Sequence, residues 1–140
     1  MERREFLTSS CSLCAGLGTA LLISGLSSCA TNSLYTAEIE NNSVHVPLSL
    51  FSENDFQIIR PKNFSYDIAI QKLENGSFAA LLLSCTHAAN QLTFTGNSYF
   101  CKLHGSAFNK QGMVTKGPAE QSLKKLGTQI SDDNLIVSID

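Results

Sequence analysis

The sequence predicts a small all-β domain, an antiparallel sandwich or barrel, that follows a targeting segment at the N-terminus. Short apolar stretches recur from residue 44 onward, and clusters of Gly, Asn and Asp separate several of them. Helical periodicity is weak throughout this part of the chain. Many short strands divided by turn signals are typical of a small antiparallel sandwich or barrel.

The expected strands follow one another in chain order. Apolar and β-branched residues predict them at residues 44–50, 56–60, 67–72, 78–83, 92–95, 98–100, 126–131 and 134–139. Turns are expected at residues 74–76, 96–97, 109–112 and 132–134, because Gly and Asn tolerate the backbone conformations that tight turns need. Helical spacing is present only at residues 120–126, which is a short segment.

Residues 1–29 have the features of an export signal. Arg3 and Arg4 precede Phe6 and Leu7, and an uncharged stretch rich in Leu, Gly, Ala and Ser then runs to residue 30. This arrangement resembles a twin-arginine signal, which exports proteins that have already folded. The alternative is a membrane-spanning helix. The stretch is long enough to span, but its Gly and Ser residues make it only weakly hydrophobic.

The signal ends in Leu26-Ser27-Ser28-Cys29, which resembles a lipobox. Cys29 is therefore the expected lipid anchor, and several acyl chains on one residue give stable membrane binding. An uncleaved signal anchor and a released soluble form are the alternatives. Residues 30–43 are small and polar and are expected to form a tether, which leaves residues 44–140 as the folded domain. The expected location is the bacterial cell envelope, on the exported side of the membrane.

Charge and cysteine content narrow the possible functions. Ten Lys and Arg stand against 12 Asp and Glu without a basic patch, so nucleic-acid binding has little support. Of the five cysteines, Cys11 and Cys14 lie in the signal and Cys29 is the lipobox residue. Cys85 and Cys101 remain for the mature domain, and if both bind metal, no disulfide is possible there.

Two short motifs carry the chemistry of the domain. The first is Cys85-Thr86-His87 and the second runs from Cys101 to His104, so each supplies one thiolate and one imidazole. The 13 residues between them, 88–100, contain a tight-turn signal at residues 95–98, and a hairpin there would fold the second motif back beside the first. Two thiolates and two imidazoles suit either an iron–sulfur cluster or a tetrahedral zinc ion.

The two motifs resemble the cluster-binding motifs of the Rieske family. The pattern is C-x-H from Cys85 to His87, then C-x-x-H-G-S from Cys101 to Ser106. A third motif, Gly117-Pro118-Ala119, resembles the proline loop of that family. Three separate motifs in the right order make the resemblance specific, and it covers most of the mature domain.

The resemblance implies one [2Fe–2S] cluster per chain, in which one iron is bound by cysteines and the other by histidines. By position, the cysteine ligands are Cys85 and Cys101, and the histidine ligands are His87 and His104. The resemblance further implies a scaffold of strands with the cluster-binding loops at one tip, where the proline loop covers the cluster from a third side.

Neighbouring residues are expected to set the reduction potential. Ser106 matches a serine whose hydroxyl bonds a bridging sulfide in the high-potential members of the family, whereas Phe108 stands where those members have a tyrosine. Asn90 and Leu103 stand where they have two additional cysteines. These departures predict an intermediate potential, within the family range of roughly −150 to +300 mV and below its upper end.

The resemblance implies a one-electron carrier that is not an enzyme in its own right. The expected partner of a membrane-anchored carrier is a redox protein, either a cytochrome or a quinol-oxidising complex, in a respiratory or quinol-linked chain. The alternatives are a small ferredoxin-like subunit of an exported oxidoreductase, and a zinc module or redox sensor. The third histidine, His45, is expected on the solvent face of a strand. It is the one histidine left after the cluster takes its pair, so the two histidines that the second iron of a Rieske oxygenase needs are not available.

Overall fold

The computed structural model describes residues 34–140. The expected signal at residues 1–29, with Arg3, Arg4 and the expected lipid anchor Cys29, lies outside the described residues, as do Cys11 and Cys14. Within residues 34–140, no helix is long and apolar enough to cross a membrane.

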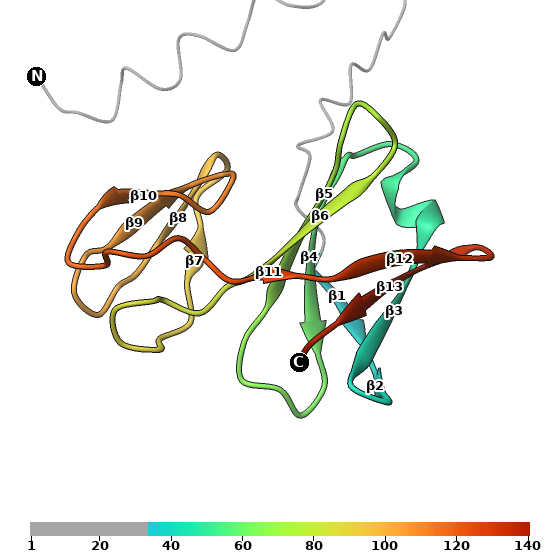
Figure 1. The fold of residues 1–140 in the computed structure, drawn as a ribbon, viewed down its shortest axis with the longest axis horizontal. Helices are drawn as coiled ribbons and strands as arrows, with labels where there is room; N and C mark the ends of the chain where they lie inside the picture. Colours follow the sequence, from blue (N-terminus) through green and yellow to red (C-terminus); the bar gives the residue numbers. More distant parts are fainter. Residues whose placement is uncertain (1–33) are drawn as a thin grey trace, which may run out of the picture. The chain divides into compact units, whose positions relative to one another are not determined.

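Residues 34–140 form thirteen strands and one short 3-10 helix (Figure 1). In chain order, the strands are β1 (Leu34–Ala37), β2 (Ile39–Glu40), β3 (Ser43–Pro47), β4 (Phe56–Pro61), β5 (Ile68–Lys72), β6 (Phe78–Leu82), β7 (Thr93–Phe94), β8 (Ser98–Phe100), β9 (Ala107–Asn109), β10 (Val114–Lys116), β11 (Lys125–Leu126), β12 (Thr128–Ser131) and β13 (Asn134–Ser138). The 3-10 helix, η1, spans Leu48–Phe51.

The strands form three open sheets. The first has the order β1-β4-β5-β6-β11, the second β10-β9-β8-β7 and the third β12-β13-β3-β2. Strands β1 and β4 pair in parallel, and the other pairs of described strands are antiparallel. The predicted all-β, mainly antiparallel class is therefore confirmed, as open sheets rather than as a closed barrel.

The first and third sheets share one apolar core. On β3, Val44 and Val46 are fully buried while His45 between them is exposed, because successive side chains of a strand point to opposite faces. The expectation that His45 faces solvent is therefore confirmed. The core also contains Ile59 from β4 and Leu135 from β13.

A second apolar core connects the second sheet with the first. It contains Tyr99 from β8, Phe108 from β9 and Leu81 from β6, together with Cys85 and Cys101. Figure 1 shows the β7–β10 sheet beside the other two, connected to them by the segment from β6 to β7 and by the segment that returns from β10 to β11. The cysteines of both loops are therefore part of this core.

Two expected strands are wrong in part. Residues 48–50 belong to η1, because the chain turns after Pro47 and buries Phe51 edge-on against Phe78, with ring centroids 4.9 Å apart. Residues 126–131 form two strands instead of one. Leu126 pairs within the first sheet and Thr128 within the third, so the chain changes sheets at Gly127.

The possible helix at residues 120–126 is also wrong. Leu123 is buried and its amide donates to Gly112 O over 2.8 Å, while residues 125–126 form β11. These long-range hydrogen bonds replace the local bonds that a helix would make. The sequence pattern also missed β9 and β10, which have three residues each and are stabilised by pairing with each other and, for β9, with β8.

Two further strands lie within the segment that was expected to be a tether. Strand β1 pairs with β4, strand β2 pairs with β3, and Ala37 is buried. Residues 34–40 therefore belong to the folded domain, and the expected tether of residues 30–43 is too long. Both strands lie at the edges of their sheets, where backbone hydrogen bonds to one neighbour stabilise a strand whose side chains are mostly exposed or half-buried.

Candidate metal centre

The first cysteine motif lies in a loop between β6 and β7. Cys85 N donates to Asn90 O over 2.8 Å, and Ala89 N donates to Cys85 O over 2.8 Å, which closes residues 85–90 into a compact turn. Ala89 adopts a φ of 43°, and its carbonyl oxygen accepts a 2.8 Å hydrogen bond from the Tyr66 hydroxyl. The loop is thus held both by its own backbone and by a distant side chain.

The second cysteine motif, between β8 and β9, has the same backbone pattern. Cys101 N donates to Ser106 O over 2.8 Å, and Gly105 N donates to Cys101 O over 3.0 Å. Gly105, with a φ of 82°, takes the place that Ala89 has in the first loop, and this left-handed conformation favours glycine. Strands β7 and β8 pair between the two motifs, so the hairpin predicted from residues 95–98 is confirmed.

The structure brings the four candidate ligands together, with the cysteines inside and the histidines outside. Cys85 is 2% exposed and Cys101 1% exposed, and both are free thiols, whereas His87 and His104 are exposed. The two imidazole centroids lie 5.0 Å apart with an interplanar angle of 83°. Two imidazoles that bind one tetrahedral ion at about 2.0–2.1 Å have their ring centres at roughly this separation.

Several hydrogen bonds converge on the sulfur of Cys101. Burial raises the pKa of this thiol, but the backbone amides of Leu103 and His104 lower it, as do hydrogen bonds with the side chains of Cys85 and Asn90. The net effect is a pKa below the ordinary value for cysteine. The thiolate, which is the form that binds metal, therefore forms more readily at Cys101 than at an ordinary cysteine.

A third segment contacts both cysteine loops. Ala119 N donates to Ser106 Oγ over 3.0 Å, in a fully buried contact with the second loop. Thr86 Oγ1, in the first loop, donates to Gln121 O over 2.6 Å. The segment at residues 117–121 is therefore hydrogen-bonded to both loops.

Gly117 and Pro118 begin this segment and are joined by a cis peptide bond. Pro118 lines a shallow depression together with His87 and Glu120. The expected proline-loop residues are thus beside one of the candidate histidine ligands, on the exposed side of the site.

Phe108 and Tyr99 lie opposite each other on paired strands in the core that contains both cysteines. Phe108 is fully buried, and its ring has no hydroxyl to donate to a ligand sulfur. The Tyr99 hydroxyl donates to Lys110 O over 3.3 Å, and burial raises the pKa of Tyr99 to about 12. Phe108 therefore contributes apolar packing to the core that contains both cysteines.

Sequence reasoning missed two contributors to this site, Thr86 and Gln121, which join the first loop to the proline loop. It named Ala119 as part of the proline-loop motif, but not the hydrogen bond from the Ala119 amide to the second loop. The position of Thr86 between a cysteine and a histidine was a sequence signal. Backbone donors and acceptors leave no trace in residue identity, so only the folded chain reveals the roles of Gln121 O and Ala119 N.

The donor set fits a two-iron cluster. Among the described residues, no three His, Cys, Asp or Glu side chains gather around one point as ligands of a single ion. The candidate ligands instead divide into a buried pair of sulfurs and an exposed pair of imidazoles, which matches one iron on each side. Buried Ser106 accepts a hydrogen bond from Ala119 N, so its own hydroxyl hydrogen remains for an acceptor such as a bridging sulfide.

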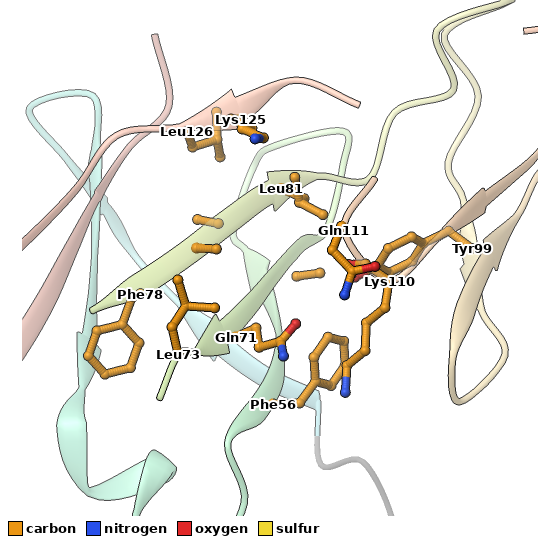
Figure 2. A pocket seen from close by; sticks show the side chains of 13 residues that line it. Phe56, Gln71, Leu73, Phe78, Leu81, Tyr99, Lys110, Gln111, Lys125 and Leu126 are labelled. Atoms are coloured by element: carbon orange, nitrogen blue, oxygen red, sulfur yellow. The ribbon is translucent and has the colours of Figure 1, made fainter. Parts of the chain in front are cut away.

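A separate pocket of about 380 Å³ lies between β5, β6 and the turn after β9 (Figure 2). Figure 2 shows apolar side chains such as Leu73 and Leu81 around it, with Gln71 and Lys110 nearby. None of the four candidate ligands lines this pocket, so it is not part of the metal centre.

A scaffold of antiparallel strands that carries two cysteine–histidine loops and a third loop against them defines a cluster-binding domain of the Rieske type. The Rieske [2Fe-2S] domain matches residues 44–127, which is more than half of the 140-residue chain, and the chain belongs to this family. Its cofactor is a [2Fe–2S] cluster.

Curated relatives include iron-sulfur subunits of the cytochrome b6-f complex. The subunit of Prochlorococcus marinus is 39% identical over 56 residues, which cover 39% of this chain and 32% of that protein. Subunit 1 of Synechocystis is 33% identical over 69 residues, which cover 46% of this chain and 39% of that protein. The matched part of the chain thus spans only about a third of the length of these relatives.

Solved structures have the same fold. The plasma membrane Rieske protein PetC3 of Synechocystis superposes with a TM-score of 0.52 and 23% identity, over 66% of this chain and 94% of that chain. A chain from the complex of oxygenase and ferredoxin in carbazole 1,9a-dioxygenase gives a TM-score of 0.50 and 20% identity, over 72% of this chain and 96% of that chain. The predicted Rieske-type fold is therefore confirmed.

Proposed function

We propose that this chain is a membrane-anchored one-electron carrier in a respiratory or quinol-linked electron-transfer chain. The observation that carries the proposal is the division of the site: the two cysteines are buried, while His87 and His104 are exposed at its outer side. A partner protein can approach the imidazoles without any opening of the domain. The names of the relatives, subunits of a cytochrome complex, support a partner of that kind.

Each candidate ligand has a distinct role in this proposal. When bound, the cluster accepts and releases single electrons. Cys85 and Cys101 would hold one iron through sulfurs that lie in the apolar core, away from water. His87 and His104 would hold the other iron on the exposed side of the site, where a partner can approach. The backbone hydrogen bonds that close the two loops keep these side chains in place between redox states.

The N-terminal sequence supports membrane attachment on the exported side of the cell envelope. The resemblance of residues 1–29 to a twin-arginine signal and of Leu26–Cys29 to a lipobox supports a lipid on Cys29. Folded export would also preserve a cluster that is inserted in the cytoplasm. The expected partners are therefore the membrane and a cytochrome or quinol-oxidising complex.

Iron and sulfide analysis with electron paramagnetic resonance (EPR) of the reduced protein tests the ligand assignment. We expect two irons and two sulfides per chain and a Rieske-type spectrum. Cys85→Ser should abolish the signal, whereas the control His45→Gln, at an exposed position on β3, should leave it unchanged. Zinc in place of iron, or a normal cluster in Cys85→Ser, would refute the assignment.

Membrane fractionation and co-purification test the setting. The full chain should fractionate with membranes, and Cys29→Ala should release it if the anchor is a lipid. A cytochrome or quinol-oxidising complex should co-purify from solubilised membranes. Recovery with only a soluble oxidoreductase would instead favour a ferredoxin-like subunit, to which the likeness in fold to a dioxygenase complex lends some support.

A further inference from the structure

Asn90 contacts both cysteine motifs at once. Its backbone oxygen accepts the 2.8 Å hydrogen bond from Cys85 N that closes the first loop. Its side-chain nitrogen Nδ2 lies 3.9 Å from Cys101 Sγ in the second loop. Among the described residues, this side chain makes the only hydrogen bond from the first loop to a sulfur of the second, apart from that of the Cys85 thiol.

The orientation of the Asn90 amide is fixed by a second acceptor. Nδ2 also donates to Gln91 O over 3.2 Å. A carbonyl oxygen can only accept, so the nitrogen end of the amide must face it, and the other N–H of the same group then points toward Cys101. The amide is half-buried and cannot turn its oxygen toward the sulfur without losing this bond.

The two loops also place Asn90 in the position that corresponds to Ser106. Both residues close their loop in the same way. The Asn90 carbonyl oxygen accepts a hydrogen bond from the Cys85 amide, five residues earlier, and the Ser106 carbonyl oxygen accepts one from the Cys101 amide, also five residues earlier. Ser106 lies beneath the second loop with a buried hydroxyl, and Asn90 closes the first loop with a side chain that reaches the sulfur of the other. The polar side chain at this position therefore joins its loop to another part of the site, Asn90 to the second cysteine loop and Ser106 to the proline loop.

We propose that Asn90 is a positioning residue whose hydrogen bond links the two cluster-binding loops and stabilises negative charge on the Cys101 sulfur. A donor to a ligand sulfur favours the reduced cluster, which carries one more negative charge, and so raises the reduction potential. This link is a hydrogen bond and not a disulfide, since the cysteines of both loops are free thiols. This inference rests on the ligand assignment proposed above.

Redox titration of the purified, cluster-loaded full chain, monitored by EPR, tests the inference. Asn90→Leu keeps the approximate volume but removes the donor, and Asn90→Asp replaces the donor by an acceptor. Both should lower the midpoint potential, Asn90→Asp by more, because its carboxylate also adds negative charge near the sulfur. The EPR g-values should shift in both variants, since the electron density on the Cys101 sulfur changes.

Gln91→Leu is the matched control. The Gln91 side chain accepts from Asp67 N over 2.9 Å and donates to Leu92 O over 2.8 Å, so its loss loosens the same loop without removing a donor to sulfur. It should lower the melting temperature and leave the potential unchanged. If Asn90→Leu does not retain iron, Asn90→Ser restores a short donor and should recover it in part.

The outcomes separate this inference from the proposed function. A wild-type chain without iron refutes the ligand assignment. A wild-type cluster with an unchanged potential in Asn90→Leu overturns the role of Asn90 alone. Equal loss of the cluster in Asn90→Leu and Gln91→Leu would also overturn it, because loop folding would then explain both results.

Discussion

Ser106 shows how a single side chain joins two loops of the site. Its hydroxyl oxygen is the acceptor for the amide of Ala119, and the serine is fully buried. Ala119 is buried as well, so water has little access to either partner. A buried amide that loses its acceptor keeps the full cost of its desolvation.

Ser106→Ala should therefore destabilise the domain by about 1–3 kcal/mol, the cost of a buried unsatisfied donor. Urea unfolding of the protein without metal measures this free energy apart from any effect on the cluster. The control is Ser52→Ala, since the Ser52 hydroxyl donates to Ser49 O at an exposed position and its loss should change stability little. Equal effects of the two substitutions would contradict the proposed link between loops.

The burial of the Tyr99 side chain predicts that stability decreases at high pH. Burial raises its pKa to about 12 in the folded protein, against about 10 in an unfolded chain. Between these values the folded state binds more protons than the unfolded state, so the free energy of unfolding falls as pH rises above about 10. Below about pH 10, the stabilisation that the protonated Tyr99 side chain provides is fully present.

The pH dependence can be measured by urea unfolding at several pH values from 8 to about 11. Tyr99→Phe should flatten the fall in this range because it removes the group that titrates. An ultraviolet titration of the folded protein should likewise lose its last-titrating phenol in Tyr99→Phe. If all tyrosines of the wild-type protein ionise near pH 10, Tyr99 is not buried in solution.

At the scale of elements, the turn between β9 and β10 is hydrogen-bonded to the segment that leads from β10 to β11. Gly112 N donates to Asn109 O over 2.9 Å, and Gly112 O accepts from Leu123 N over 2.8 Å. Gly112 has a φ of 83°, and a Cβ there would lie 3.2 Å from Leu123 Cβ and from the methyl carbons of Leu81. Both conformation and space therefore require glycine.

Gly112→Ala should destabilise the domain more than Gly76→Ala. Gly76 has a similar φ of 80°, but a Cβ there meets no atom within 4 Å, so its substitution incurs only the backbone cost of about 1–2 kcal/mol. The difference between the two free energies of unfolding then measures the crowding against Leu81 and Leu123. Equal costs would show that the core yields without penalty at this turn.

At the scale of the whole molecule, the described residues contain two apolar cores with different relations to the cluster. The core shared by the second sheet and the first includes both cysteines, whereas the core between the first and third sheets includes neither. Metal binding adds its free energy to the region whose residues it holds together. Loss of the cluster should therefore affect the two cores unequally.

Removal of the cluster should increase hydrogen exchange mainly in residues 85–106 and in β9 and β10. Amides of β3 and β13, which pair within the third sheet, should remain protected. Hydrogen-exchange mass spectrometry of the loaded and metal-free protein measures both regions in one experiment. A uniform loss of protection would show that the two cores unfold as one cooperative unit.

The sequence by itself determined the class of fold and the candidate ligands. Alternation such as Val44-His45-Val46 predicted strands, and the spacing of cysteine and histidine predicted the metal motifs, because both patterns are written in neighbouring residues. The signal at residues 1–29 and the anchor at Cys29 stay predictions, since they lie outside the described residues.

The tertiary structure decided the features that depend on distant partners. The edge strand β1 exists because β4 offers it backbone hydrogen bonds, and the strand expected at residues 126–131 is divided between two sheets at Gly127. The contacts of Asn90 with Cys101 and of Ala119 with Ser106 join residues that no local pattern relates. Local sequence carries side-chain periodicity and ligand chemistry, but a hydrogen bond between distant segments exists only once the chain has folded.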